Sequence, residues 1–203
     1  MMTLYETKTA PNPRRVRMFL TEKGVGVNYA QIDIEKGENL TPEMLAKNPL
    51  GKVPILELED GTCISECDAI CTYLEAQFPE PCLMGKTPLG KGIVAMWQRR
   101  MEVGLMLPIG QFFQHTTGYF RDRMTPVPEF GQEAGKDYKK SLTILDQCLA
   151  ESEFIAGDAF SIADITALCA IDFARVVKMR LDDNHPNVQR WHASVSQRPS
   201  AKA

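Results

Sequence analysis

The sequence predicts an α/β domain followed by an all-α domain, and three observations support this fold class. In the first part of the chain, short strand-like runs alternate with helical segments. From residue 92 onward, apolar residues recur three and four positions apart, which is typical of packed helices. Between these parts, residues 81–91 contain two glycines and two prolines, as a linker does. We therefore expect an α/β domain over residues 1–82, a linker over 83–91 and a helical domain over 92–203.

Each element of the first domain has a local signal. Alternating apolar residues predict strands, prolines open two of the helices, and the turn Asp60-Gly61 joins the last two strands. The expected strands are residues 2–5, 27–34, 53–58 and 62–65, and the expected helices are residues 14–23, a short helix opened at 41–43, and residues 68–77. The order β-α-β-α-β-β-α is that of a mixed sheet with helices.

The second domain is expected to contain helices only. The first helix runs from residue 92 until Pro108 bends or ends it. Residues 125–128 hold two prolines and predict a loop. Further helices are expected over residues 131–151, 162–179 and 186–198.

Composition narrows the possible functions. The 203 residues are 44% hydrophobic and 24% charged, which is typical of a globular protein. A net charge of -3 argues against broad electrostatic binding to nucleic acid or to an anionic membrane. The longest apolar stretch carries Arg99, Arg100 and Glu102, so it does not predict a membrane span. With no leader segment visible, the six cysteines are expected to be free thiols in a reducing cytoplasm.

The first motif is the segment 48–54, which ends at Val53-Pro54 before a strand. Proline cannot donate to a sheet ladder, so its position there is unusual. A cis bond before Pro54 would leave the amide and carbonyl of Val53 free to pair with an extended peptide. The alternative is a trans proline at a strand edge.

The second motif is Ser65-Glu66-Cys67-Asp68, between a strand and a helix. Glu66 and Cys67 would lie at the helix N-terminus, where N–H groups and the helix dipole attract a carboxylate. The Glu66 carboxylate could accept from an ammonium group of a ligand, so this turn is suited to the charged end of an amino acid. Alternatively, Ser65 or Asp68 only caps the helix.

Together these motifs resemble the glutathione-binding domain of cytosolic glutathione transferases. The resemblance rests on residues 48–54, the turn at 60–61 and residues 65–70. In the second domain, residues 160–165 are similar to the family's helix-capping box, with Ser161 as the cap and Asp164 reaching back. The resemblance covers the whole chain and is closest to bacterial members, with a theta-like and a nu-like class both open.

The resemblance implies a thioredoxin-like domain followed by a helical domain, a cytoplasmic homodimer, and glutathione as co-substrate without a metal. Val53 and Pro54 would bind the cysteinyl part of glutathione, and Glu66 and Cys67 its γ-glutamyl end. Lys52 and Asn39 would face the glycyl carboxylate. Cys67 stands where the family usually has serine or threonine. Because a thiol donates weakly, that contact would depend on the backbone amide.

The residue that activates the glutathione thiol is less obvious, since Ala10 stands where many members have serine. The thiolate is the nucleophile, so a donor must stabilise it. We expect the Asn12 amide to be this donor, aided by the start of the next helix and by nearby arginines, with Thr9 as the reserve. The alternative is that Asn12 only caps the helix.

The family places the electrophile pocket along the first helices of the second domain, and Trp97, Met101 and Phe112 are the candidates there. These side chains could instead belong to the core or to a dimer contact. The expected function is conjugation of glutathione to small hydrophobic electrophiles in detoxification. The alternatives are a glutathione-dependent disulfide reductase and a non-catalytic glutathione-binding or dimerisation module.

Overall fold

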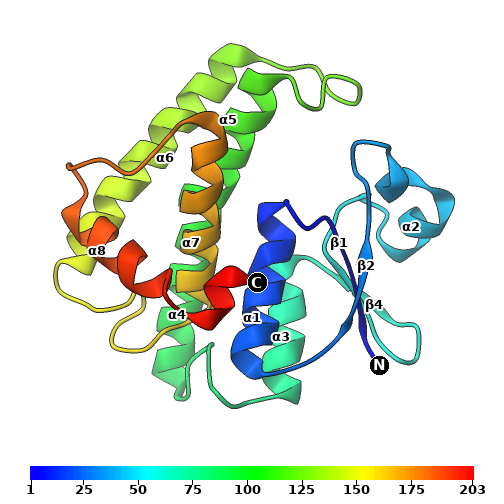
Figure 1. The fold of residues 1–203 in the computed structure, drawn as a ribbon. Helices are drawn as coiled ribbons and strands as arrows, with labels where there is room; N and C mark the ends of the chain where they lie inside the picture. The colour runs from blue at the N-terminus through cyan, green and yellow to red at the C-terminus, as the bar shows by residue number, and fades with distance from the viewer. The chain divides into compact units, whose positions relative to one another are not determined.

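The computed structural model describes residues 1–203 and divides into two compact units (Figure 1). The first unit comprises residues 1–82 together with 199–203, and the second comprises residues 83–198. The last five residues thus group with the α/β part, although the sequence pattern placed them with the helices. The first helix of the second unit begins at Pro88, inside the range expected to be a linker.

The first unit is built on a four-stranded mixed sheet, as predicted. Its strands are β1 (Thr3–Glu6), β2 (Asn28–Gln31), β3 (Ile55–Glu57) and β4 (Cys63–Ser65), in the order β2-β1-β3-β4. β1 is parallel to β2 and antiparallel to β3, and β3 is antiparallel to β4. Tyr5 is paired with Ile55, which is paired with Ser65, while Glu6 is paired with Gln31. One end of the sheet therefore gathers the segments that follow β1, precede β3 and follow β4.

Three α-helices complete the first unit: α1 (Pro11–Lys23), α2 (Pro42–Lys47) and α3 (Cys67–Gln77). Figure 1 shows α1 and α3 side by side on one side of the sheet and α2 on the other. Apolar side chains of α1, α3 and the central strands fill the space between them, among them Leu4, Phe19, Leu56 and Ile70. Two short 3-10 helices, η1 (Glu38–Leu40) and η4 (Pro199–Lys202), complete the unit.

The second unit is entirely helical, as predicted. Its elements are α4 (Pro88–Met101), a π-helical turn η2 (Glu102–Met106), α5 (Leu107–Thr117), α6 (Pro128–Leu149), α7 (Ile162–Ala174), the 3-10 turn η3 (Arg175–Val177) and α8 (Pro186–Val195). Most side chains of α7 are buried, so this helix forms the centre of the unit. Trp191 of α8 is completely buried.

Pro108 changes the helix that contains it without ending the helical run. Proline has no N–H for the carbonyl four residues earlier, and its ring crowds that carbonyl. The chain relieves this conflict by widening to a π turn immediately before α5. Gly104 in this turn lies so close to α6 that an added Cβ would meet the Ser141 Oγ at 2.8 Å.

The predicted capping box opens α7. The Ser161 hydroxyl accepts from the Ala163 amide at 3.3 Å, and the Asp164 carboxylate accepts from the Ser161 amide at 2.9 Å. Asp164 also accepts from the Ile155 amide at 3.0 Å and from the Trp191 indole N–H at 2.8 Å. This carboxylate therefore joins the start of α7 to α8 and to the loop before α7.

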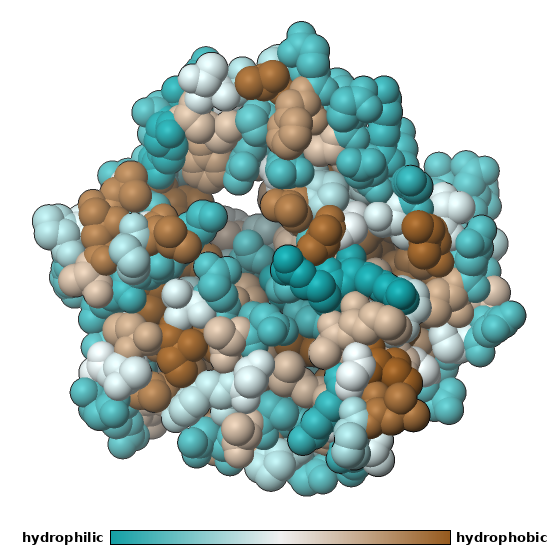
Figure 2. Space-filling view, turned by 180° about the vertical axis from the view of Figure 1, so that it is seen from behind, coloured by the Kyte–Doolittle hydropathy of each residue, from teal (hydrophilic) through white to brown (hydrophobic).

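No helix in the structure has both the length and the apolar character that a membrane crossing requires. On the face seen in Figure 2, hydrophobic and hydrophilic residues alternate over short distances. Several large apolar side chains are nevertheless exposed, including Leu50 and Leu89.

Candidate functional site

The loop before Val53 is held from beneath by two buried asparagines. The Asn48 amide donates to the Lys52 carbonyl at 2.9 Å, while its oxygen accepts from the Leu50 amide at 3.1 Å. The Asn39 amide donates to the Gly51 carbonyl at 2.7 Å. Gly51 has a φ of 58°, and an added Cβ would lie 2.7 Å from a Leu40 methyl carbon, so no other residue fits there without strain. The loop is thereby fixed up to Lys52.

Val53 follows this fixed loop, and its main chain is unpaired. Neither its N–H nor its carbonyl has a hydrogen-bond partner within the protein, and the residue is partly exposed. The bond from Val53 to Pro54 is cis, in agreement with the first of the two interpretations of this motif. Pro54 itself is buried at the start of β3. Val53 therefore offers one donor and one acceptor at the end of the sheet where the other motif lies.

Glu66 has an unusual backbone conformation at the start of α3. Its φ of 70° and ψ of 127° fall in a region that side-chain-bearing residues rarely adopt. It occupies the N-cap position, yet its exposed side chain makes no capping hydrogen bond. The interpretation of Ser65 as the helix cap is therefore wrong, since Ser65 is the last residue of β4. The surrounding chain holds the Glu66 carboxylate outward and uncommitted.

Cys67 connects this turn to the start of α1. Its side chain is buried, and its thiol donates to the Asn12 carbonyl at 3.3 Å. The thiol is thus occupied inside the protein. As a result, Asn12 lies next to the Glu66-Cys67 turn, although 54 positions separate Asn12 from Glu66 in the sequence.

Asn12 is not the cap of α1. The helix begins at Pro11, and Ala10 occupies the N-cap position without a side-chain hydrogen bond. The Asn12 oxygen accepts from the Arg15 guanidinium at 3.1 Å, which leaves the amide N–H₂ as the available group. Pro11 and Pro13 have no N–H, and the Asn12 backbone N–H has no partner in the protein. Asn12 therefore presents both its side-chain and its backbone donor at the positive end of a helix.

The remaining candidates of the first unit differ in their exposure. Lys52 and Thr9 are exposed, and neither side chain makes an ion pair or hydrogen bond within the protein. Asn39 is only 7% exposed. Its position beneath Gly51 indicates that it orders the loop. Arg14 donates to the Ala201 carbonyl at 2.8 Å and so contacts the C-terminal segment.

The three candidates of the helical unit differ in burial and in their contacts. Met101 is 3% exposed and belongs to the core. The Arg100 guanidinium lies 4.7 Å from the centre of the Trp97 ring. Phe112 packs against α6, where an added Cβ on Gly135 would lie 2.6 Å from its ring. The structure therefore brings together the candidates at the sheet end; in the helical unit, Trp97 and Met101 lie one turn apart on α4, and Phe112 lies on α5.

The cysteines are unpaired, and two of them have perturbed thiols. All six thiols are free, and burial raises the pKa of Cys63 and Cys148, which disfavours their nucleophilic thiolate forms. No cluster of three or more His, Cys, Asp or Glu side chains has a metal-binding arrangement.

Two comparisons by sequence decide the family. The model of the glutathione S-transferase N-terminal domain matches residues 4–82, and that of the C-terminal domain matches residues 114–199. Glutathione S-transferase 2 of Saccharomyces cerevisiae is 38% identical over 205 residues, which span 99% of this chain and 88% of that protein. The chain belongs to the glutathione S-transferase family. It is a transferase of that family, whose members use glutathione.

Solved structures agree with this assignment. A glutathione S-transferase domain-containing protein of Marinobacter aquaeolei VT8 is 40% identical, with a TM-score of 0.94 and 98% of each chain covered. Gtt2 of Saccharomyces cerevisiae is 38% identical, with a TM-score of 0.95 and the same coverage. The predicted fold, a thioredoxin-like domain followed by helices, is thereby confirmed for this glutathione S-transferase.

The sequence patterns missed three features of the candidate site. Asn48 orients the loop, and Arg15, which the sequence indicates only as a source of positive potential near the sulfur, orients the Asn12 amide. Asn48 has a weak signal, because an asparagine before proline with a glycine close behind marks a tight turn. The third feature, a buried charge at Glu6, has no signal in the sequence beyond its inward position on an alternating strand.

Proposed function

We propose that this glutathione S-transferase binds glutathione across the end of its sheet and conjugates it, through its sulfur, to small hydrophobic electrophiles. Glutathione is a tripeptide with an ammonium and a carboxylate at its γ-glutamyl end and a second carboxylate at its glycyl end. The free main chain of Val53 carries the proposal, because an extended peptide needs one donor and one acceptor in this orientation. Pro54 shapes the adjoining surface.

The charged side chains near Val53 indicate which end of glutathione lies on which side of this residue. The exposed Glu66 carboxylate is suited to the ligand ammonium, and the start of α3 at Cys67 to the γ-glutamyl carboxylate. The unpaired Lys52 ammonium is suited to the glycyl carboxylate. In this proposal Asn39 acts beneath the loop, since its amide is already bonded to Gly51.

The two donors of Asn12 are proposed to stabilise the glutathione thiolate. A hydrogen bond to a charged group contributes roughly 1.5–3 kcal/mol, which corresponds to about one to two units of thiol pKa. The dipole of α1 adds to this stabilisation. Thr9, exposed in the preceding turn, is the reserve donor. Because Arg15 binds the Asn12 oxygen, the side chain is oriented to donate.

In the transfer step the thiolate sulfur attacks an electrophilic carbon. A carbon–sulfur bond forms, the leaving group departs with the bonding electrons, and the thiol proton has already passed to solvent. The electrophile is proposed to bind on the helical unit, where Trp97 and Phe112 are candidates for contact and the buried Met101 serves packing. We also propose that the protein acts in detoxification, in the cytoplasm and as a homodimer. The proposed functional division is a glutathione-binding domain over residues 1–82, a linker over 83–91 and a helical domain over 92–203.

The test combines calorimetry, thiol titration and turnover. We expect the protein to bind glutathione at micromolar to low millimolar concentration and to lower the pKa of its thiol, measured by ultraviolet thiolate absorbance. Asn12→Ala should raise that pKa by about one unit, with Thr9→Ala as the comparison. An unchanged thiol pKa and turnover in Asn12→Ala would exclude the Asn12 side chain as the activating donor.

Two alternatives are separated by the same measurements. Turnover of a haloarene supports conjugation, whereas turnover confined to a small glutathione-reducible disulfide would identify a disulfide reductase. Binding of glutathione without turnover, or no binding at all, would support a non-catalytic glutathione-binding or dimerisation module. The free Val53 main chain and the uncommitted Glu66 argue against this last outcome.

A further inference from the structure

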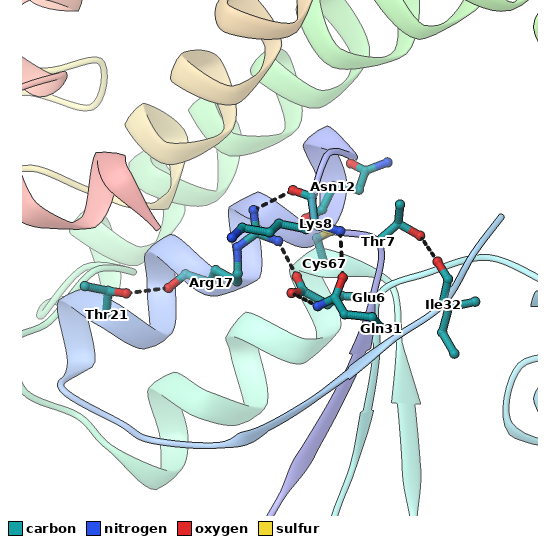
Figure 3. A network of polar contacts seen from close by, with 9 residues as sticks. All are labelled: Glu6, Thr7, Lys8, Asn12, Arg17, Thr21, Gln31, Ile32 and Cys67. Carbon is teal, nitrogen blue, oxygen red and sulfur yellow. Dashed lines mark hydrogen bonds and ion pairs between the residues drawn. The ribbon is translucent and has the colours of Figure 1, made fainter. Parts of the chain in front are cut away.

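A closed ring of hydrogen bonds lies beneath the turn that precedes α1 (Figure 3). The Glu6 carboxylate accepts from the Arg17 guanidinium with one oxygen and from the Gln31 amide at 2.6 Å with the other. Arg17 also donates to the Lys8 carbonyl at 2.9 Å, and the Lys8 N–H donates to the Gln31 oxygen at 3.1 Å. β1, α1 and β2 thus contribute one side chain each, and both backbone polar groups of Lys8 close the ring.

Lys8 is a central residue of a tight turn. The Ala10 N–H donates to the Thr7 carbonyl at 2.9 Å, so the turn spans Thr7 to Ala10. Thr7 is itself fixed by its hydroxyl, which donates to the Ile32 carbonyl at 2.6 Å. Ala10 leads directly into Pro11 and Asn12. The ring therefore determines the direction in which the chain enters α1.

The ring is poorly explained as a stabilising device. Glu6 is 2% exposed and Arg17 is 7% exposed, so both charges have lost most of their hydration. Buried ion pairs often contribute no more to stability than well-packed apolar residues. In addition, the Nε of Arg17 is buried without a partner, an unfavourable state for an N–H donor. The benefit that remains is the defined geometry at Lys8.

We infer that Glu6, Arg17 and Gln31 are positioning residues for thiol activation. They act through the Lys8 backbone to place the Asn12 donors against the glutathione sulfur, an inference that rests on the proposed function. Lys8 itself contributes only its backbone, since its side chain is exposed.

The directions of the four hydrogen bonds provide a sharp test. Glu6 must accept twice, whereas Gln31 must donate to Glu6 and accept from Lys8. In Glu6→Gln, one amide N–H₂ faces another donor whichever way the two glutamines are turned. In Gln31→Glu, two carboxylates face each other. Either single substitution therefore breaks the ring at one contact.

The double variant Glu6→Gln/Gln31→Glu restores every contact. Glutamine at position 6 accepts from Arg17 and donates to glutamate at position 31, which still accepts from the Lys8 N–H. Because Gln31 is exposed at the sheet edge, a carboxylate there keeps its contact with water. The experiment is thus a double-mutant cycle, in which the double variant is predicted to be less impaired than either single variant.

We expect each single variant to lose about tenfold in kcat/KM for glutathione and to raise the pKa of the bound thiol. The double variant should recover to within about threefold of the parent protein. Thr21→Ala is the matched control, because it removes a 2.9 Å hydrogen bond to the Arg17 backbone carbonyl and leaves the ring intact. If Glu6→Gln does not fold, Gln31→Leu at the exposed edge removes the contacts of Gln31 with both Glu6 and Lys8 and leaves the Glu6–Arg17 pair in place.

The outcomes separate this inference from the proposed function. If the parent protein neither binds glutathione nor lowers its thiol pKa, the proposed function fails. If the parent does both and the single variants retain its thiol pKa and kcat/KM, the ring is purely structural and the inference is overturned. A double variant as impaired as the single variants also overturns it.

Discussion

Two buried carboxylates, one in each unit, have contrasting surroundings. Asp164 in the helical unit accepts from two backbone amides, from the Ser161 hydroxyl and from the Trp191 indole. Glu6 in the sheet unit accepts only from two long side chains, those of Arg17 and Gln31. Asp164 is fully buried and Glu6 nearly so.

The difference concerns what each carboxylate holds in place. The donors of Asp164 include two backbone amides and the indole of the buried Trp191, and they join parts of a core that is already packed. The donors of Glu6 have flexible stems, and they lead to a turn beside the candidate site. We therefore expect the loss of Asp164 to affect mainly the stability of the protein, and the disruption of the Glu6 contacts to affect mainly the geometry of the turn.

The largest effect is expected for Asp164→Ala. Its removal leaves four buried donors without an acceptor, so we expect the free energy of unfolding to fall by about 4 kcal/mol and Tm by about 10 °C. Urea unfolding measures the first quantity and calorimetric scanning the second. The folded fraction should bind glutathione with unchanged affinity. A loss of affinity in that fraction would contradict the division of roles between the two carboxylates.

The next effect is expected for Glu66→Gln. The change replaces a carboxylate by a neutral amide opposite the ligand ammonium, so the Kd for glutathione should rise at least tenfold. Since the Glu66 side chain caps nothing, the stability of the free protein should stay the same. Glu43→Gln, an exposed carboxylate in the first turn of α2, is the control for charge. Equal affinities in both variants would remove Glu66 from the site.

A smaller effect is expected for Lys52→Met. The exposed ammonium and a ligand carboxylate interact partly through solvent, so the Kd for glutathione should rise about three- to tenfold. The dependence of the Kd on salt concentration should weaken in this variant. Lys91→Met, an exposed lysine of the helical unit, controls for net charge. An unaltered salt dependence would argue against a direct role of Lys52.

The smallest effect concerns Glu57, a half-buried carboxylate on the sheet with a Tyr5 hydroxyl at 2.6 Å and a Lys47 ammonium at 2.9 Å. The Tyr5 hydrogen bond, followed by Lys47, lowers the pKa of Glu57 below its ordinary value of 4.5. A lowered pKa contributes stability above the unfolded value, and this contribution is lost as the pH falls through the folded value.

Tyr5→Phe should therefore reduce stability by up to about 1 kcal/mol near neutral pH and less at pH 3. Urea unfolding across this pH range measures the difference. A difference that stays constant with pH would show that Glu57 is not the group responsible. Glu57 thus shares one property with each buried carboxylate. Like Glu6, it accepts from side chains; like Asp164, it is expected to contribute to stability.

Local patterns predicted most of the fold. Alternation in β1 and β2, the Asp60-Gly61 turn and the periodicity of α6 and α7 were sufficient to place those elements within a few residues. The start of α1 was misplaced because Pro11 and Pro13 are both compatible with a first helical turn. The turn closed by Ala10 decides in favour of the earlier start.

The sequence predicted the motifs of the candidate site but not the contacts that hold those motifs in place. Val53 and Glu66 stand in contiguous strings that can be read directly. The strained φ of Glu66 is imposed by the surrounding chain on a residue that does not prefer it. The contacts of Glu6 with Arg17 and Gln31 join positions 11 and 25 residues apart, and only the sheet topology brings them together.

The short η4 helix near the end of the chain has a practical consequence. It docks on α1, where the Ala201 carbonyl accepts from Arg14 and the Ser200 hydroxyl donates to Glu22. The sheet unit is thus assembled from two separate stretches of polypeptide, residues 1–82 and 199–203, so cleavage of the chain at one position cannot yield a fragment that contains all of it. A fragment of residues 1–82 would lack this cover, and a synthetic peptide of the last residues should bind it in trans.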